Sequence, residues 1–414
     1  MPNYCDAASA GLLSVDQAKQ AIASAICPIV DNESIALNQA LGRVLSEGVV
    51  SQIDIPPHRN AAMDGYAFAS SDLKSDCETS LSVVGCSWAG RPFSGEAKQG
   101  ECVRIFTGAV VPDFADSVIA QEQVERQADL IMLQASAPRL KNIRAAGSDV
   151  MCNDKLLDAG KILTAIDLGL LASASVASVK VRRRLRIGFF STGDELISLS
   201  QSLGPGQIYD SNRYLLSGLL THPNHEVTDL GIIKDDADCL QQTLIKASQQ
   251  FDVLISSGGA SVGDADFVKQ ALESCGEVNF WKIAIKPGKP LAFGRVGSCW
   301  YFGLPGNPVA VSVTYQQFVQ PALHCLSGAK REQSLRLRAY CEQALRKAPG
   351  RQEYQRGLLR QNPDGELIVS LAGSQDSHQQ KSASRANCYI VLGADCVAVA
   401  VGEYVDVEPF SILI

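Results

Sequence analysis

Three short stretches of the sequence carry side chains that could bind an anionic ligand together with a metal ion. The first, SSGGASVGDADF at 256–267, directly follows the apolar run FDVLI. Backbone N–H groups of such small residues can form an anion-binding nest, and Asp264 and Asp266 could hold Mg²⁺ through their oxygens or through water. The aspartates could instead cap a helix that begins near Phe267, and the loop taken alone favours this alternative. Asp264 suits the cap better, which leaves Asp266 freer for a ligand.

A second acidic stretch, STGDEL at 191–196, repeats the arrangement of strand, small polar turn and carboxylates. It carries Asp194 and Glu195, and helix capping is again the alternative. Carboxylates that cluster without a cation repel one another. Two such loops at one edge of a sheet therefore favour a metal ion between them.

The third stretch, WKIAIKPGKP at 281–290, contains three lysines. It is not a phosphate-binding Walker loop, because no Gly-Lys-Ser/Thr follows the required spacing. Strand alternation would place Lys282 and Lys286 on one face, where they could neutralise an anion or form a solvated edge. Downstream, LPGNP at 304–308 predicts a rigid turn with Asn307 as the N-cap of a helix whose N-terminus favours anions. A plain strand-to-helix turn is equally consistent with that pattern.

The composition is that of an ordinary soluble protein, with 46% hydrophobic and 20% charged residues. A net charge of −7 argues against broad nucleic-acid binding, although a few lysines in one cleft can still bind a small anion. The 13 cysteines include no Cys-x-x-Cys pair, which is typical of a reducing compartment. The N-terminal stretch does not resemble a signal peptide, and the most apolar segment is too short to cross a bilayer. These features predict a cytoplasmic protein that contacts neither nucleic acid nor membrane.

Strands and helices alternate from Leu185 onward. Five stretches have the pattern of strands: LRIGFF, EVTDLGII, FDVLIS, VNFWKIAI and WYFGLP. A helical pattern follows each of the first three, and another begins at Pro308. Such alternation predicts a mainly parallel sheet with helices on both faces. Ligands of these folds lie beyond the carboxyl ends of the strands. The three stretches should therefore meet at one edge of the sheet.

The rest of the chain divides around this α/β segment. Ser14 and Thr164 each precede a helical pattern, and short β-type runs at about 46–145 predict a β-rich lobe inserted between the helices. Strand patterns return after residue 330, with a turn at 362–365. We expect three domains, at 1–180, 181–330 and 331–414. The histidines of HPNH at 222–225 are interpreted as surface residues.

Ten stretches taken together resemble the molybdopterin molybdenumtransferase family, which includes MoeA and the E domain of gephyrin. In order, they are PPHRNAAMDGYA, IFTGAVVP, GSDV, FFSTGDEL, GQIYDSNRY, LGIIKDD, SSGGASVGDADF, WKIAIKPGKP, FGLPGNPV and YQRG. The resemblance implies insertion of molybdate into adenylylated molybdopterin with release of AMP in the presence of Mg²⁺. It also implies a multidomain α/β fold with a MogA-like central domain, the inserted β-rich lobe and a small C-terminal domain resembling a β-barrel.

The resemblance assigns residues to three roles. As catalytic residues it implies Asp64, Thr107, Asp149, Glu195, Lys282 and Lys286. As substrate-binding residues it implies Asp235, Ser257, Gly258, Gly259, Ser261, Pro305, Pro308, Arg356 and Ser377, the last two towards molybdate. As metal ligands it implies Glu195 and Asp266.

The resemblance further implies a homodimer with clefts built between subunits, and contact with a MogA-type adenylyltransferase. Two departures from the family pattern stand out: Ser148 replaces a frequent acid in GSDV, and THPNHEV replaces the usual Leu-Gly before a strand. Two alternative functions stay open, a molybdopterin adenylyltransferase and a gephyrin-like scaffold without catalysis. A scaffold would not need the acid cluster that this sequence keeps.

Overall fold

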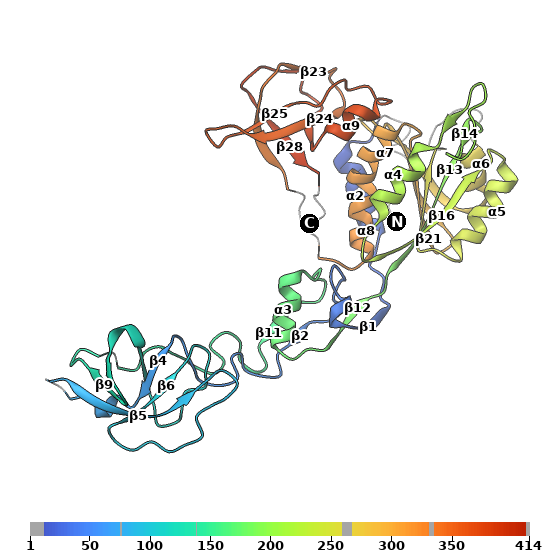
Figure 1. Cartoon of the computed structure of the whole chain (residues 1–414). Coiled ribbons are helices and arrows are strands. Elements are labelled where there is room, and N and C mark those ends of the chain that lie inside the picture. The colour runs from blue at the N-terminus through green and yellow to red at the C-terminus, as the bar shows by residue number, and fades with distance from the viewer. Residues whose placement is uncertain (1–11, 75–76, 138, 259–266, 331–334, 411–414) are drawn as a thin grey trace. The chain divides into compact units, whose positions relative to one another are not determined.

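The structure is a computed structural model of the chain. It describes residues 12–74, 77–137, 139–258, 267–330 and 335–410 (Figure 1). The chain forms two compact units. The first comprises Met1–Glu33, Gly42–Ser46 and Val181–Ile414, and the second comprises Ser34–Leu41 and Glu47–Lys180. No helix within the described residues is long and apolar enough to cross a membrane.

A six-stranded sheet forms the centre of the first unit. Its strands, in spatial order, are β16 (His225–Ile233), β13 (Leu185–Thr192), β17 (Val253–Ser257), β21 (Cys299–Leu304), β20 (Pro290–Val296) and β18 (Glu277–Lys282). The first four are parallel, and β20 and β18 are antiparallel additions at one edge. Every residue of β17 is buried, as expected for a parallel strand covered on both faces. The predicted mainly parallel sheet is confirmed.

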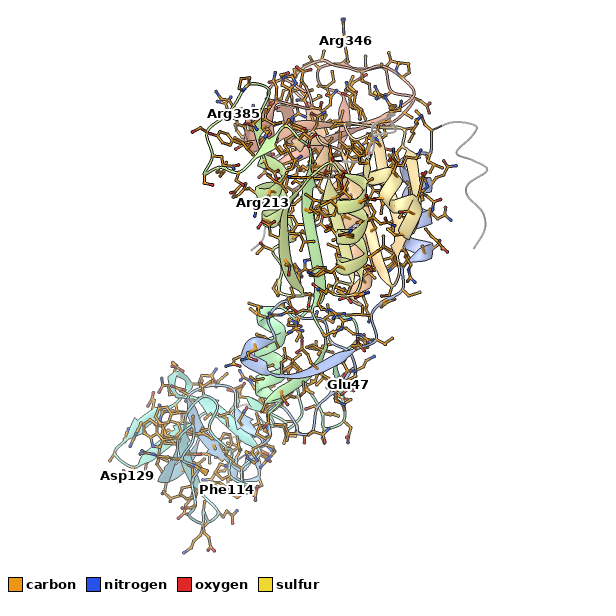
Figure 2. The ribbon with its side chains drawn as sticks, turned by 90° about the vertical axis from the view of Figure 1, so that its right-hand side faces the viewer. Glu47, Phe114, Asp129, Arg213, Arg346 and Arg385 are labelled. Carbon is orange, nitrogen blue, oxygen red and sulfur yellow. The ribbon has the colours of Figure 1, made fainter. Side chains whose placement is uncertain are left out.

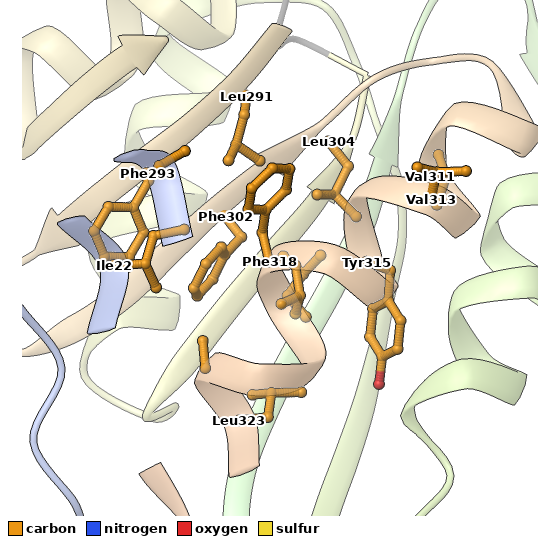
Figure 3. Close-up of a cluster of buried hydrophobic side chains, with 14 of the residues drawn as sticks. Ile22, Leu291, Phe293, Phe302, Leu304, Val311, Val313, Tyr315, Phe318 and Leu323 are labelled. Carbon is orange, nitrogen blue, oxygen red and sulfur yellow. The ribbon is translucent and has the colours of Figure 1, made fainter. Parts of the chain in front are cut away.

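Helices cover both faces of this sheet, as predicted (Figure 1). On one face lie α2 (Val15–Ala25), α4 (Ser211–Leu220), α7 (Pro308–Thr314), a π-helical turn (Tyr315–Val319) and α8 (Gln320–Leu326). On the other lie α5 (Ala237–Ser248) and α6 (Phe267–Cys275). Successive side chains of a strand point to opposite faces, so Phe189 packs in the first core and Phe190 in the second. Figure 3 shows the first core, where Phe302, Phe318 and Tyr315 lie together.

Helix α2 begins at the predicted cap. The Ser14 hydroxyl accepts a hydrogen bond from the Gln17 N–H (3.1 Å), and the Gln17 side chain accepts one from the Ser14 N–H (2.8 Å). Ala18 and Ile22, on the predicted apolar face, are buried in the first core. The helix therefore packs within the first unit, although the sequence placed it in the segment 1–180.

The C-terminal region forms a closed five-stranded β-barrel, which confirms the predicted barrel-like domain. Its strands are β22 (Leu337–Cys341), β24 (Gln352–Gln361), β25 (Leu367–Leu371), β26 (Cys388–Leu392) and β28 (Tyr404–Pro409). Pairing runs β24–β25–β22–β28–β26 and returns to β24. Closure removes the exposed strand edges of an open sheet. Side chains such as Val369, Ile390 and Val407 fill the interior.

One short strand joins the barrel to the α/β part of the first unit. We expected VNFWKIAI to be a single strand, but it breaks after Lys282. The Ala284 N–H instead donates to the Leu13 carbonyl (2.7 Å), and β19 (Ile285–Lys286) pairs in parallel with β24 of the barrel. Alternation along one strand therefore does not relate Lys282 to Lys286, and that part of the sequence argument was wrong. The break places Lys286 beside the barrel.

The second unit contains the predicted β-rich lobe. Its sheet has the order β7 (Ser117–Ala120), β4 (Gly65–Phe68), β6 (Glu101–Ile105), β5 (Thr79–Ser87), β9 (Leu130–Leu133) and β8 (Glu125–Gln127). Entering strands β2 (Val49–Val50) and β3 (Asn60–Ala61) pair with leaving strands β11 (Lys155–Leu157) and β10 (Ile143–Arg144). Pairing of the entering with the leaving chain confirms that the lobe is an insertion. Helix α3 (Ala165–Ser173) follows, with Thr164 as its predicted cap. Strands β1 (Asn32–Ala36) and β12 (Ser178–Arg182) form a further ribbon.

One of the two histidines of HPNH, His225, is buried in a way that should make the stability of the first unit depend on pH. The His225 ring is mostly covered, its Nδ1 lies 2.9 Å from the Leu220 carbonyl oxygen, and its ring centroid lies 4.9 Å from that of His222. Burial lowers the pKa of His225 to about 4. Between pH 6.5 and pH 4 the His225 ring is therefore mostly neutral in the folded chain, whereas it would be mostly protonated in the unfolded chain. The surface interpretation of this residue was wrong.

We expect this burial to reduce stability on acidification. Because the pKa of His225 is lower in the folded state than in the unfolded state, the free energy of unfolding is unaffected by its titration above about pH 6.5. It decreases as the pH falls from 6.5 towards 4, because the unfolded state takes up the proton first. At pH 5 the loss should be about 2 kcal/mol. Urea unfolding of the wild type and of His225→Gln at pH 7.5 and 5.0 checks this. Equal losses in the two proteins would show that His225 does not titrate on unfolding.

Candidate active-site cleft

A cleft of about 970 Å³ opens at the carboxyl ends of the parallel strands. Thr192, Ser257 and Pro305 lie at or just beyond the ends of β13, β17 and β21 and line it. The turn after β19 and two segments of the barrel domain complete the lining. Of the residues implied by the resemblance, the cleft brings together Glu195, Asp235, Ser257, Gly258, Lys286, Pro305, Pro308 and Ser377.

The acidic side of the cleft follows β13 and β16. Glu195 comes after Gly193, and a Cβ atom at Gly193 would lie 2.7 Å from a carboxylate oxygen of Glu195. Glycine is thus needed at 193, where φ is +148°. The Asp235 carboxylate accepts a hydrogen bond from the Thr192 hydroxyl. Both carboxylates therefore line one cleft, and that of Asp235 is held by a residue at the end of β13.

Gly258 is the described beginning of the Gly-rich loop. Its N–H donates to the Leu304 carbonyl (3.1 Å), its φ is +92°, and a Cβ atom there would lie 2.6 Å from the Thr192 carbonyl oxygen. Only glycine fits this close approach of three strand ends. Gly259, Ser261 and Asp266 lie outside the described residues.

Gly258→Ala should lower the free energy of unfolding by about 1–3 kcal/mol, because the methyl group meets a backbone oxygen and the left-handed backbone is strained. The same substitution at Gly218, in the last turn of α4 with open space around it, should raise the free energy of unfolding by about 0.5–1 kcal/mol. Urea unfolding measures both changes. A Gly258→Ala variant as stable as Gly218→Ala would contradict the steric argument.

The basic side of the cleft comes from β19, the turn after it and the barrel domain. Lys286, Lys289 and Arg351 line it. The Lys286 ammonium lies 3.0 Å from the Glu353 carboxylate, whose side chain is only 6% exposed, whereas that of Lys286 is 46% exposed. The side chain of Lys286 is thus held by a buried partner on β24 while it remains accessible from solvent.

The turn after β21 combines rigid backbone with the start of a helix. Pro305 and Pro308 line the cleft, and Pro308 is the first residue of α7, as predicted. Asn307 occupies the N-cap position, but its side chain makes no capping hydrogen bond. The predicted cap is therefore confirmed in its position and wrong in its hydrogen bond.

Arg356 reaches the cleft indirectly. Its side chain is 1% exposed, and its guanidinium donates to the Ser382 hydroxyl (3.0 Å) and to the carbonyls of Ser374 (2.6 Å) and Asp376 (3.2 Å). Burial lowers the pKa of Arg356 from its usual value. These bonds hold the segment 374–376, whose neighbour Ser377 lines the cleft. One guanidinium nitrogen, Nη1, is buried without a partner among the described residues.

Four further residues implied by the resemblance are not among the described residues that line the cleft. Lys282 is exposed at the end of β18 and is not among the described residues that line the cleft. Asp64, Thr107 and Asp149 belong to the second unit. There the Asp64 carboxylate accepts hydrogen bonds from the Thr107 hydroxyl (2.7 Å) and N–H (2.8 Å). These two bonds hold the pKa of Asp64 below its usual value, so the carboxylate is ionised at neutral pH.

Several lining residues were not predicted as site residues. Asp210 and Asn212 belong to the stretch GQIYDSNRY, which we noted only as part of the resemblance, and Arg351, Tyr354 and Gln375 come from the barrel domain. In the structure Asp210 is the N-cap of α4, and nothing in the local sequence distinguishes an aspartate that caps a helix from one that also lines a cleft. For the barrel residues the sequence offers no local signal, because the pairing of β19 with β24 brings them to the cleft.

The donor set of the cleft suits a hard divalent cation. Glu195 and Asp235 supply carboxylate oxygens on the same side, and Mg²⁺ is bound through one or two carboxylates plus waters and substrate phosphates. Within the described ranges, no group of three or more His, Cys, Asp or Glu side chains is placed to hold a metal by itself. The residues fit a cation that is bound together with its ligand.

Three family models match successive parts of the chain. They are the MoeA N-terminal region (domains I and II) at residues 13–175, the probable molybdopterin binding domain at 188–325, and the MoeA C-terminal region (domain IV) at 338–410. Together they define a chain with the domain order of MoeA.

Individual relatives agree with this class. A molybdopterin molybdenumtransferase of Haemophilus influenzae is 42% identical over 405 residues, which cover 97% of this chain and 100% of the relative. One of Nostoc is 40% identical over 72% of this chain and 70% of the relative. A crystal structure of the molybdopterin biosynthesis MoeA protein of Pyrococcus horikoshii is similar, with a TM-score of 0.84 and 27% identity over 97% of this chain and 100% of that one. The chain therefore belongs to the molybdopterin molybdenumtransferase family, as the sequence resemblance predicted.

Proposed function

We propose that this chain inserts molybdate into adenylylated molybdopterin and releases AMP, with Mg²⁺ bound in the cleft. The observation that carries the proposal is a single cleft lined both by the carboxylates of Glu195 and Asp235 and by the cations Lys286, Lys289 and Arg351. A substrate that joins a phosphate to an adenylate needs both cations and a metal-binding group. The volume of about 970 Å³ lies at the upper end of small-molecule sites, about 300–1,000 Å³. The name of the relatives, molybdopterin molybdenumtransferase, supports the transfer of molybdenum to molybdopterin.

The cleft residues would stabilise the negative charge that develops when AMP departs. The phosphoanhydride carries negative charge that increases on the departing AMP as the P–O bond breaks. The Lys286 and Lys289 ammonium groups would stabilise this charge from fixed positions. Glu195 would hold Mg²⁺ with Asp266, and the bound ion would supply further charge withdrawal. Molybdate is a substrate here, and the dithiolene sulfurs of molybdopterin would receive the molybdenum.

The tail of the barrel domain would receive the molybdate. Ser377 lines the cleft and its loop is held by Arg356. A hydroxyl and a guanidinium can bind an oxyanion by charge-assisted hydrogen bonds, and Arg356 retains one unpartnered nitrogen among the described residues. We keep Lys282, Asp64, Thr107 and Asp149 as proposed catalytic residues on the resemblance alone.

The assembly is also proposed from the resemblance. We infer a cytoplasmic homodimer that receives its substrate from a MogA-type adenylyltransferase. Light scattering of the purified full chain tests the first part, with a mass twice that of the 44.2 kDa chain expected. A monomeric mass at micromolar concentration would reject the dimer without affecting the proposed reaction.

A further inference from the structure

Two buried oxygen atoms of the cleft have no hydrogen-bond partner among the described residues. They are the Oδ2 atom of Asp210 and the Oδ1 atom of Asn212. Asp210 is 2% exposed and Asn212 is 8% exposed, and both residues line the cleft. An unsatisfied buried acceptor is destabilising and rare in folded proteins. Two of them, in residues two positions apart that line one cleft, indicate that a ligand supplies the missing donors.

The local structure fixes which oxygen of Asp210 is left over. Asp210 precedes α4, the helix that carries Arg213 (Figure 2). Its Oδ1 accepts a hydrogen bond from the Arg213 N–H (3.1 Å), and its own N–H donates to the Ile197 carbonyl (3.1 Å). A helix cap needs only one acceptor, and serine or asparagine would supply it without a charge. Capping therefore does not account for the second carboxylate oxygen.

Asn212 is fixed in the same way. Its amide nitrogen donates to the Ser257 hydroxyl (2.7 Å) and to the Gly306 carbonyl (2.6 Å). These bonds use both hydrogens of the amide and link α4 to the ends of β17 and β21. Only Oδ1 remains, and it can only accept. The side chains of Asp210 and Asn212 thus present two acceptors and no free donor.

We propose that Asp210 and Asn212 bind the N–H-donating edge of an amino-substituted nitrogen heterocycle. The inference rests on the proposed function, whose substrate carries two such rings, a pterin and an adenine. Phosphate oxygens are excluded from this position because they are acceptors themselves. Mg²⁺ is assigned to Glu195 and Asp266 in the proposed function, and the test below distinguishes a metal ligand at Asp210 from a heterocycle site. The heterocycle would therefore lie at α4, and the phosphates would lie at Lys286 and Lys289.

The Asp210→Asn variant replaces one hydrogen-bond acceptor with a donor and changes the shape of the side chain little. Its Oδ1 can keep the cap on Arg213, which turns the amide nitrogen, a donor, to the place of Oδ2. The matched control is Asp236→Asn. Asp236 caps α5 through the Cys239 N–H (2.8 Å), is exposed and does not line the cleft within the described residues.

Binding of 6-hydroxymethylpterin, followed by its fluorescence, and of AMP, followed by calorimetry, tests the site on the full chain. We expect Asp210→Asn to weaken one of the two ligands by about 10- to 100-fold, and the ligand that is affected identifies the ring. Asp236→Asn should leave both affinities within twofold. If Asp210→Asn does not fold, Asp210→Ser keeps the cap and removes the second acceptor without adding a donor, and it should weaken the same ligand.

Unchanged affinity for both ligands in a folded Asp210 variant would overturn the inference. So would a change confined to the Mg²⁺ requirement, which would make Asp210 a metal ligand. These measurements need no turnover. A chain that releases no AMP on addition of molybdate, but loses a heterocycle through Asp210→Asn, would reject the proposed function and retain the heterocycle site.

Discussion

Replacing Lys286 with glutamine is expected to lower molybdate-dependent AMP release by about 100-fold. The change removes a cation from the cleft and leaves the Glu353 carboxylate, 6% exposed, without the ammonium that lies 3.0 Å from it. A buried charge without its partner is costly, and here it also repels an anionic substrate. Steady-state kinetics on the purified chain should show a lower kcat and a higher KM.

A control and a second variant separate the causes. Lys246→Gln, on the exposed last turn of α5, should leave activity within twofold. If repulsion by Glu353 dominates, the double variant Lys286→Gln/Glu353→Gln should recover a large part of the loss. If the ammonium acts directly on the anhydride, the double variant should stay as slow as Lys286→Gln. Activity of Lys286→Gln within twofold of the wild type would remove this lysine from the site.

Arg356→Ala is expected to raise the molybdate concentration for half-maximal turnover by at least about tenfold. Without the guanidinium, the carbonyls of Ser374 and Asp376 lose their donor, so the loop that carries Ser377 is no longer held. Binding of adenylylated molybdopterin should change little, because the proposed function places its phosphates at Lys286 and Lys289. Arg356→Lys keeps the charge but not the forked geometry, and it should give an intermediate value.

The control for this experiment lies on the same strand. Arg360 of β24 is exposed and pairs with Glu342, and an exposed ion pair contributes about 0–1 kcal/mol. Arg360→Ala should therefore match the wild type in its molybdate dependence. Thermal unfolding of both variants shows whether the barrel remains folded. If Arg356→Ala lost the pterin ligand and kept its molybdate dependence, the assignment of the barrel tail to molybdate would be wrong.

Features that depend on local sequence were predictable. Ser14 and Thr164 form the expected caps, because the side chain that caps and the N–H that it accepts from are three residues apart. The parallel sheet followed from the alternation of strands and helices, and the convergence of the loops at 191–196 and 304–308 followed from the position of ligands in such sheets. Glu195 and Pro305 accordingly line one cleft.

Features that depend on long-range pairing were not predictable. The break after Lys282 arises because Leu13, far away in sequence, pairs with this segment and β24 accepts Ile285 and Lys286 as an additional strand. Burial of Arg356 likewise depends on closure of the barrel, because its partners come from the segment 374–382. The role of Asp210 could not be predicted from the sequence either. An aspartate before a helix is accounted for by capping alone, and the oxygen without a partner among the described residues is seen only in the folded chain.

The most direct test of the proposed function is AMP release from adenylylated molybdopterin by the purified full chain, with and without molybdate. The proposal predicts that AMP appears only when molybdate and Mg²⁺ are both present, and that one molybdenum is bound to molybdopterin for each AMP released. Release of AMP at the same rate without molybdate would contradict it. Formation of adenylylated molybdopterin from ATP would identify an adenylyltransferase instead, and the absence of any turnover would favour a scaffold.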